Sequence, residues 1–298
     1  MVKKLLLACV CLSLMVGSLR AQDREFVATA RKTMQTYEKA VITLSVVLKI
    51  EVRGAEAGES KAQVPAIVID PAGLVVASLS GLSPHGKVRA GGRTVEIESR
   101  VQEVKYRLTD GTELPARVVL KDDDLDVAFL MPQKALDEAA KAQLTSIPLN
   151  DAASQVQPMD STILLGRANE DLNYALLLVE GRILATISQP RNCYVADGGV
   201  LGMPVFNGQG KLIGMTCRCV KNEGEGTVRM STISNQLILP AADIARLVPQ
   251  AKDEAKKAAA EAEKKPAKSK KAAAAKKPGE KKSDAKKSED KKASQDQK

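Results

Sequence analysis

Residues 195–206 read V-A-D-G-G-V-L-G-M-P-V-F, and this stretch decides how the rest of the chain is interpreted. Three glycines, Gly198, Gly199 and Gly202, precede Met203-Pro204 and an apolar strand. Glycine adopts backbone angles that other residues avoid, so such a loop can turn several N–H groups towards one point. The side chains that would act together with the loop have to come from elsewhere in the chain.

The loop resembles the active-site loop of trypsin-like serine peptidases, nearest to the HtrA/Deg type, where the family sequence is G-N-S-G-G-P-L. Alignment on Pro204 puts Gly199 on the first family glycine and Gly202 on the glycine after the nucleophilic serine. Leu201 then stands at the serine position. The resemblance implies a retained backbone loop without its nucleophile. Gly199 and Gly202 either keep a nest that binds a carboxylate or carbonyl, or only allow the loop to turn, and we favour the turn.

Two earlier blocks resemble the same family. V-I-D-P-A-G-L-V-V-A-S-L-S (68–80) is similar to the family hairpin whose second strand ends at the catalytic histidine, and this places Ser80 at the histidine position. T-D-G-T-E-L-P-A-R-V-V-L-K-D-D-D-L-D-V-A-F-L (109–130) resembles D-G-x-x-x-P-A-x-V-V-x-x-D-x-x-x-D-I-A-V-L and retains the third triad residue as Asp126. L-L-G-R-A-N (164–169), V-E-G-R-I-L-A (179–185) and N-G-Q-G-K-L-I-G-M (207–215) follow in family order.

The order of these blocks implies an all-β fold, a trypsin-like double antiparallel barrel over residues 41–250 with the site at the barrel interface. Apolar spacing over 23–38 predicts a helix in an N-terminal segment, residues 22–40, and the pattern over 238–248 predicts a C-terminal helix. Strands are expected at 41–52, on both sides of the D-P-A-G turn at 70–73, near 146–149, at 161–167, and as two strands separated by Gly181 within 174–188. Residues 54–61 are predicted to form a polar loop, and a helix or loop is expected at 134–141.

Ser-His-Asp hydrolysis requires a hydroxyl nucleophile, an imidazole base and a carboxylate that orients the imidazole. The corresponding positions are Leu201, Ser80 and Asp126, so two of the three groups are missing. We expect Ser80 to hydrogen-bond Asp126 where an imidazole would, and the side chain of Met203 to intrude on the substrate path. The alternative is a displaced site that uses His85, the only histidine, which we expect to be a solvated turn residue.

The two ends of the chain differ from its body. Residues 1–21 combine Lys3 and Lys4 with a short apolar run and small residues at Ser18 and Ala21, which predicts a cleaved signal peptide and export to the periplasm or the medium. No second apolar segment has spanning length, so we expect no transmembrane span in the mature chain. The alternative is an uncleaved anchor.

Residues 251–298 carry 17 Lys against 9 Asp and Glu, which accounts for +8 of the net charge of +9. This tail lacks aromatic and β-branched residues, so we expect it to be disordered or partly helical, its first part extending the preceding helix. It is either a solubilising extension or a weak, salt-sensitive contact for anionic polymers. Without aromatic residues to stack on bases, no specific nucleic-acid binding is expected.

Three cysteines remain after the signal peptide, Cys193, Cys217 and Cys219. An exported chain with three cysteines suggests one disulfide and one spare thiol, and Cys193 can pair with Cys217 or Cys219. A zinc site built from these cysteines and His85 has no supporting spacing, so we expect no metal and no cofactor.

These observations predict an exported HtrA-type domain without its catalytic His and Ser, acting as a non-catalytic binding or scaffold protein. Its partner would be a protein or extended peptide held in the former substrate cleft by strand addition. One alternative is a serine-type endopeptidase with a displaced active site. Another is a structural envelope protein that works through its basic tail.

Overall fold

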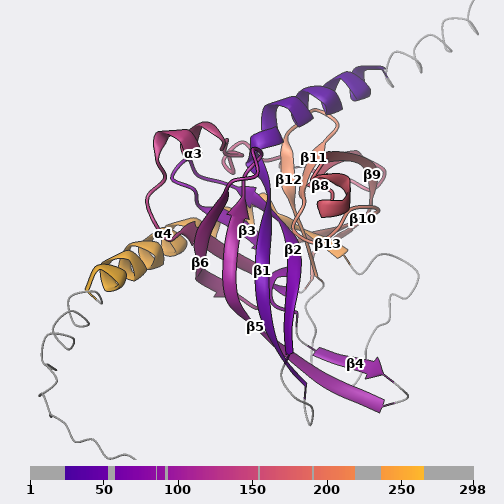
Figure 1. Ribbon diagram of the computed structural model, residues 1–298. Helices are drawn as coiled ribbons and strands as arrows, with labels where there is room; N and C mark the ends of the chain where they lie inside the picture. The colour runs from indigo at the N-terminus through magenta and orange to yellow at the C-terminus, as the bar shows by residue number, and fades with distance from the viewer. Residues whose placement is uncertain are drawn as a thin grey trace, which may run out of the picture. The chain divides into compact units, whose positions relative to one another are not determined.

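The computed structural model describes residues 24–52, 58–84, 86–90, 93–153, 155–189, 191–218 and 236–264 (Figure 1). The predicted signal peptide, His85, Cys219 and the tail beyond residue 264 lie outside the described residues. After a helix over residues 24–37, the elements are η1 (Glu38–Ala40), β1 (Val41–Val52), β2 (Gly58–Val68), β3 (Val75–Ser78), α2 (Leu79–Leu82), β4 (Gly86–Ala90), β5 (Arg93–Arg107), β6 (Glu113–Asp122), β7 (Val127–Pro132), α3 (Glu138–Ala142), β8 (Ser161–Arg167), η2 (Glu170–Leu172), β9 (Leu176–Ile187), β10 (Cys193–Ala196), β11 (Pro204–Asn207), β12 (Leu212–Arg218), β13 (Gln236–Pro240) and α4 (Ala241–Lys264).

The first barrel is a sheet in the order β1-β2-β3-β7-β6-β5, which closes because β5 also pairs with β1. All of its pairings are antiparallel. β4 pairs with the first part of β5 outside this ring, and Figure 1 shows the β4–β5 hairpin reaching away from the barrel. The second barrel is closed in the order β10-β13-β12-β11-β8-β9, again antiparallel throughout. The predicted double barrel is therefore confirmed.

Several strands read as continuous apolar runs because both of their faces are buried. In β7, Ala128 and Leu130 face the interior of the first barrel, whereas Val127 and Phe129 face a second cluster. Residues of both barrels, such as Phe129 and Phe206, share this second cluster, so it fills the junction between the barrels. Alternate residues of a strand point to opposite faces, so burying both faces removes the apolar–polar alternation of a one-sided sheet.

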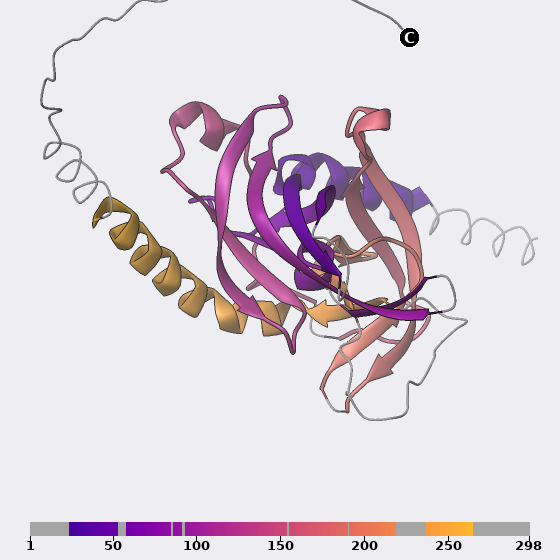
Figure 2. The same ribbon diagram turned by 60° about the horizontal axis from the view of Figure 1, so that its bottom comes forward.

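The N-terminal helix packs on the second barrel, as Figure 2 shows for the indigo helix. Tyr37 stacks on Phe206 of β11, with ring centroids 5.2 Å apart. Gly210, in the turn after β11, approaches the helix so closely that an added Cβ would lie 2.7 Å from Oγ1 of Thr33. The helix was predicted over 23–38 and occupies 24–37, and the lack of a side chain at Gly210 lets it lie against the barrel.

The C-terminal helix begins later than predicted and extends into the tail as expected. Residues 236–240 form strand β13, because they complete the ladders of β12 and β10, and α4 begins only at Ala241. The helix then runs through Pro249 and past the expected boundary at 250, as far as Lys264. Ala251 is fully buried, and Lys252 forms a 2.6 Å ion pair with Asp70. The alanine- and lysine-rich start of the tail therefore extends this helix, as its helix propensity predicts.

Contacts divide the chain into two compact units, residues 1–258 and 259–298. The first holds both barrels, and the second is described only for its helical residues 259–264. Among the described residues, no helix combines the length and the apolar character that crossing a bilayer requires.

Three smaller expectations were wrong. Gly58–Lys61 belong to β2 rather than to a loop, because they pair with residues 47–50 of β1. Residues 146–149 are not a strand, although the N–H of Ile147 donates to the carbonyl of Val68. β9 runs through Gly181 without a break, because that glycine lies against Asp197 and Thr162 rather than in a turn.

The Tyr37–Phe206 stack generates a test of how the N-terminal helix is attached. Tyr37→Ala should lower the free energy of unfolding by about 1–2 kcal/mol, because it removes a half-buried ring and its aromatic partner contact. Tyr37→Phe keeps the ring and is the matched control. Chemical denaturation of both variants measures the difference, and an equal loss in both would contradict the stacking argument.

Candidate site at the junction of the two barrels

The carboxylate of Asp126 lies at the junction of the barrels and is almost fully buried, with 1% of its surface exposed. Its Oδ2 accepts hydrogen bonds from the hydroxyl of Ser78 at 2.8 Å and from the N–H of Arg218 at 2.6 Å. Its Oδ1 accepts from the N–H of Ser80 at 2.6 Å. Three donors from the end of β3, the start of α2 and the end of β12 therefore converge on one carboxylate, and the bond to Arg218 crosses between the barrels.

The local sequence explains how Asp126 reaches this place. The residue ends the turn between β6 and β7 with φ of 56°, a left-handed conformation that Asp and Asn tolerate better than most residues. Its own carbonyl accepts from the N–H of Leu79 at 3.0 Å. Backbone and side chain of Asp126 thus both hold the start of α2.

Ser80 does not bond Asp126 in the way the sequence suggested. The hydroxyl that donates to the carboxylate belongs to Ser78, and Ser80 contributes only its backbone N–H. Ser78 is the N-cap of α2, where its Oγ also accepts from the N–H of Gly81 at 3.2 Å. Because an N-cap side chain turns back towards the first helical turn, Ser78 rather than Ser80 faces the carboxylate. His85, the alternative base, lies outside the described residues.

The glycine loop is held from below by Thr216 of β12. The Thr216 hydroxyl donates to the carbonyl of Val200 at 2.6 Å and accepts from the N–H of Met203 at 2.8 Å. The N–H of Gly202 donates to the carbonyl of Thr216 at 2.8 Å. The buried hydroxyl and the backbone carbonyl of Thr216 thereby fix both sides of the loop. Sequence reasoning did not identify this role of Thr216.

The loop glycines have positive φ, 82° at Gly199 and 88° at Gly202. A Cβ on Gly202 would collide with the carbonyl oxygen of Pro65 in β2, and one on Gly199 would lie 2.6 Å from Cδ2 of Leu164. Both glycines are therefore required for the turn and for close packing. The N–H of Gly202 is engaged inside the protein, so the predicted anion-binding role remains a prediction for Gly199.

Met203 does not intrude on a substrate path, contrary to the expectation. Its side chain is buried in the second barrel with Leu164 and Val205. It fills the space beside Gly166, where an added Cβ would lie 2.6 Å from the Met203 Cε. Its sulfur accepts the N–H of Val200 at 3.2 Å. Met203 thus points into the core because Gly166 leaves room for it.

A groove of about 390 Å³ opens beside the loop and is lined from both barrels. Val200 and Leu201 form one wall, and Val200 is 54% exposed. The lining consists of Thr43, Gln63, Val64, Pro65, Gly81, Arg167, Ala168, Asn169, Val200 and Leu201. Leu201, which has an apolar side chain and stands at the expected serine position, therefore belongs to the groove lining.

Cys193 and Cys217 are both buried, and no disulfide joins them in the structure. Cys219 lies outside the described residues, so the pairing with Cys193 remains a prediction. Burial, with a smaller effect of the nearby Asp126 charge, raises the pKa of Cys217 to about 12. No group of three or more His, Cys, Asp or Glu side chains in the described ranges is placed to hold a metal ion.

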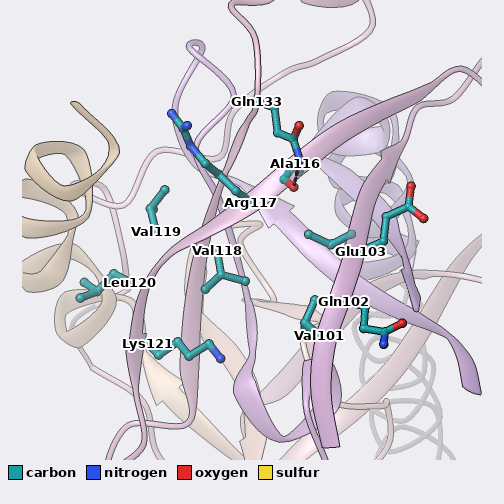
Figure 3. A pocket seen from close by; sticks show the side chains of 11 residues that line it. Val101, Gln102, Glu103, Ala116, Arg117, Val118, Val119, Leu120, Lys121 and Gln133 are labelled. Atoms are coloured by element: carbon teal, nitrogen blue, oxygen red, sulfur yellow. Dashed lines mark hydrogen bonds between the residues drawn. The ribbon is translucent and has the colours of Figure 1, made fainter. Parts of the chain in front are cut away.

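A second hollow, of about 550 Å³, lies away from the loop, between β5 and β6 (Figure 3). The two strands pair only from Val104 to Arg107 of β5. Beyond that point the ladders are irregular at Gln102 in β5 and at Val119 in β6, and both residues line the hollow. Bulges bend the strands that carry them, so the bulges at Gln102 and Val119 separate β5 from β6.

Arg117 connects the wall of this hollow to α4. Its guanidinium donates to the carbonyls of Ala258 at 3.1 Å and Ala255 at 3.5 Å. Its Nε is buried without a protein acceptor among the described residues. Figure 3 shows its side chain directed towards the helix rather than across the hollow.

Asp126→Ala should destabilise the protein by about 3 kcal/mol, because three donors, one of them fully buried, lose their acceptor and alanine disfavours a positive φ. Asp126→Asn should cost less, because an amide oxygen still accepts and Asn tolerates the backbone angle. Asp124→Ala, an exposed change in the same turn, is the control. Denaturant midpoints give the comparison, and equal midpoints for Asp126→Ala and Asp124→Ala would refute the role of the carboxylate.

Cys217 should remain unmodified by a thiol reagent at pH 8 until the protein unfolds, because its raised pKa keeps the buried thiol protonated. Below the ordinary value of 9 the folded and unfolded states hold the same proton, so the stabilising contribution is complete. Between pH 9 and about 12 only the folded state retains it, and the free energy of unfolding falls by about 1.4 kcal/mol per pH unit. Cys217→Ala should lack this part of the fall between pH 9 and 10.5. Peptide mapping separates Cys217 from the other thiols, and identical pH profiles would contradict the shift.

Comparisons with known proteins agree with this architecture. The family model described as "Trypsin-like peptidase domain" matches residues 64–215, just over half of the chain. Among solved structures, 401 chains match. One is the HtrA-type protease AlgW, a serine-to-alanine variant with a tripeptide, at 16% identity and a TM-score of 0.50. The match covers 74% of this chain but only 62% of that one, and no curated protein matches by sequence. With its double barrel like that of an HtrA-type protease, the chain belongs to the trypsin-like peptidase domain family.

Proposed function

We propose that this protein is an exported, catalytically inactive HtrA-type domain that binds extended peptide segments in the groove beside Leu201 and acts as a binding or scaffold protein. The observation that carries the proposal is the side chain at the expected nucleophile position. Leu201 lines the groove, and its side chain consists of carbon atoms alone. A hydrocarbon side chain cannot attack a carbonyl, but it can contact an apolar side chain of a bound peptide.

The state of Asp126 supports the absence of catalysis. In a triad the carboxylate accepts the N–H of an imidazole and orients the ring. Here its two oxygens already accept from Ser78, Ser80 and Arg218, and the residue is 1% exposed. The carboxylate is therefore best explained as a structural acceptor.

The edge of β2 supports the mode of binding. β2 pairs with β1 from Gly58 to Ile67, but it pairs with β3 only from Ala66 to Val68. Within the described part of the chain, its residues before Ala66 have no second strand neighbour, and Gln63, Val64 and Pro65 line the groove. An extended peptide can add to such an edge through main-chain hydrogen bonds. Exposed Val200, across the groove, then faces the added strand.

Export and a role for the tail complete the proposal. The basic n-region and short apolar run of residues 1–21 support export, to the periplasm or the medium. The lysine-rich segment after α4 would contribute a weak, salt-sensitive contact with anionic polymers rather than the principal interaction.

Catalysis is tested with purified protein lacking residues 1–21, unfolded casein as substrate and a fluorophosphonate serine probe. We expect no cleavage and no labelled serine.

Leu201→Asp and the exposed control Met159→Asp are assayed in parallel for binding of a fluorescein-labelled apolar hexapeptide. Leu201→Asp should weaken binding at least tenfold, because it places a charge where the groove is apolar, and Met159→Asp should not. Labelling of any serine would replace this proposal with a displaced peptidase site, and the loss of all binding on removal of residues 265–298 would favour the tail.

A further inference from the structure

The floor of the groove holds a cation without a carboxylate partner. Arg167, at the end of β8, is the one charged residue among those that line the groove. Its Nε donates to the carbonyl of Val41 at 2.7 Å, its Nη1 to that of Tyr174 at 3.2 Å and its Nη2 to that of Glu38 at 2.6 Å. Within the described ranges, no carboxylate lies within ion-pair distance of it. Its positive charge is thus surrounded by peptide dipoles, and no described side chain forms an ion pair with it.

Donor counting leaves Arg167 with capacity for a ligand. A guanidinium carries five N–H groups, and the three carbonyl bonds occupy one each, so two remain. Burial lowers the pKa of Arg167 and the carboxylate of Glu38 raises it in part, which agrees with a cation that is short of negative charge. Arg167 is partly buried, and a partly buried charge gains more from a partner than a fully exposed one, since less water screens the pair.

The groove continues beyond Arg167. A further hollow, of about 650 Å³ and here called the charged hollow, shares Gln63 and Asn169 with the groove. It is lined by charges of both signs. Of its cations, Lys61, Lys105 and Arg107, the last two lie within ion-pair distance of Glu113. The side chain of Gln63 donates to the hydroxyl of Tyr174 at 3.0 Å, and the guanidinium of Arg107 lies 4.0 Å from the ring of Tyr174. A peptide that enters beside Val200 therefore has space to pass Arg167 and continue.

We propose that the groove selects an extended peptide with an internal acidic side chain, whose carboxylate pairs with Arg167 while a neighbouring apolar side chain contacts Val200 and Leu201. The inference rests on the proposed peptide-binding function and adds the chemistry of the ligand. An internal acid fits better than a chain terminus, because the groove leads on into the charged hollow. Charge-assisted bonds from a planar guanidinium are the strongest that a groove of this composition offers.

The test uses two fluorescein-labelled peptides, Ala-Val-Val-Asp-Ala-Ala and Ala-Val-Val-Asn-Ala-Ala, both amidated at the C-terminus. Fluorescence anisotropy with the mature chain should show about tenfold tighter binding of the Asp peptide, as expected for one charge-assisted pair. The difference should shrink when salt is raised from about 0.05 M to about 0.5 M. The comparison uses unaltered protein, so it does not depend on the folding of a variant.

Two variants locate the preference. Arg167→Gln should bring the two affinities together. It also disturbs the carbonyl bonds between η1 and β8, so Gln63→Glu provides a milder change. Gln63 is exposed and donates to the hydroxyl of Tyr174, and a glutamate there can accept from that hydroxyl instead. Its charge should weaken binding of the Asp peptide about fivefold more than binding of the Asn peptide. Met159→Asp, outside the groove, should change neither affinity.

The outcomes separate this inference from the function on which it rests. Equal binding of both peptides would overturn the acidic preference and leave peptide binding standing. Binding of neither peptide would overturn both. A third peptide has the Asn sequence and a free C-terminus. If it binds more tightly than the amidated Asp peptide, the inference is also overturned, since the groove would then recognise a terminal carboxylate. A preference that survives in both Arg167→Gln and Gln63→Glu would show that another cation is responsible.

Discussion

One buried carboxylate fixes the geometry on which the candidate site depends. Asp126 bonds the start of α2 in the first barrel and the end of β12 in the second, so it sets where the two barrels meet. Arg218 belongs to the same strand as Thr216, and Thr216 in turn holds the glycine loop. The position of Leu201 is thus determined through a short series of bonds that begins at Asp126. A carboxylate with three donors is well suited to this task, because each bond to a charged acceptor is stronger than its neutral equivalent.

The fold could be predicted because its signals are spread along the chain. The D-P-A-G turn at 70–73, the strand around Phe129 and the N-G turn at Asn207 each fit the pattern weakly, but their order leaves one architecture. Boundaries failed where tertiary pairing decides the local structure. The segment 236–240 forms a strand because β12 and β10 lie on either side of it, and nothing within five residues of sequence contains that information.

The candidate site could be predicted only in part. Family spacing identified Asp126, Leu201 and the two loop glycines, and the structure brings the loop and the carboxylate to the same junction. The hydroxyl that bonds Asp126 belongs to Ser78, the N-cap of α2, whereas Ser80 bonds the carboxylate through its backbone N–H. Thr216 and Arg167 were missed, since their roles lie in contacts with carbonyls far away in sequence. A buried threonine in the middle of an apolar strand, L-I-G-M-T-C-R, was the available signal for the first of them.

The packing of Met203 against Gly166 has a consequence for any attempt to give this loop hydrolytic chemistry. A serine at position 201 would stand on a loop whose neighbouring N–H, that of Val200, is turned inwards to a thioether. Replacing Met203 by glycine would release that N–H but leave a void of several heavy atoms beside Gly166, since the methionine side chain is nearly completely enclosed. Refilling the void would require a larger residue at position 166, which the present methionine excludes. A change at position 166 or position 203 alone therefore lowers stability, and only a simultaneous exchange of both residues avoids that loss.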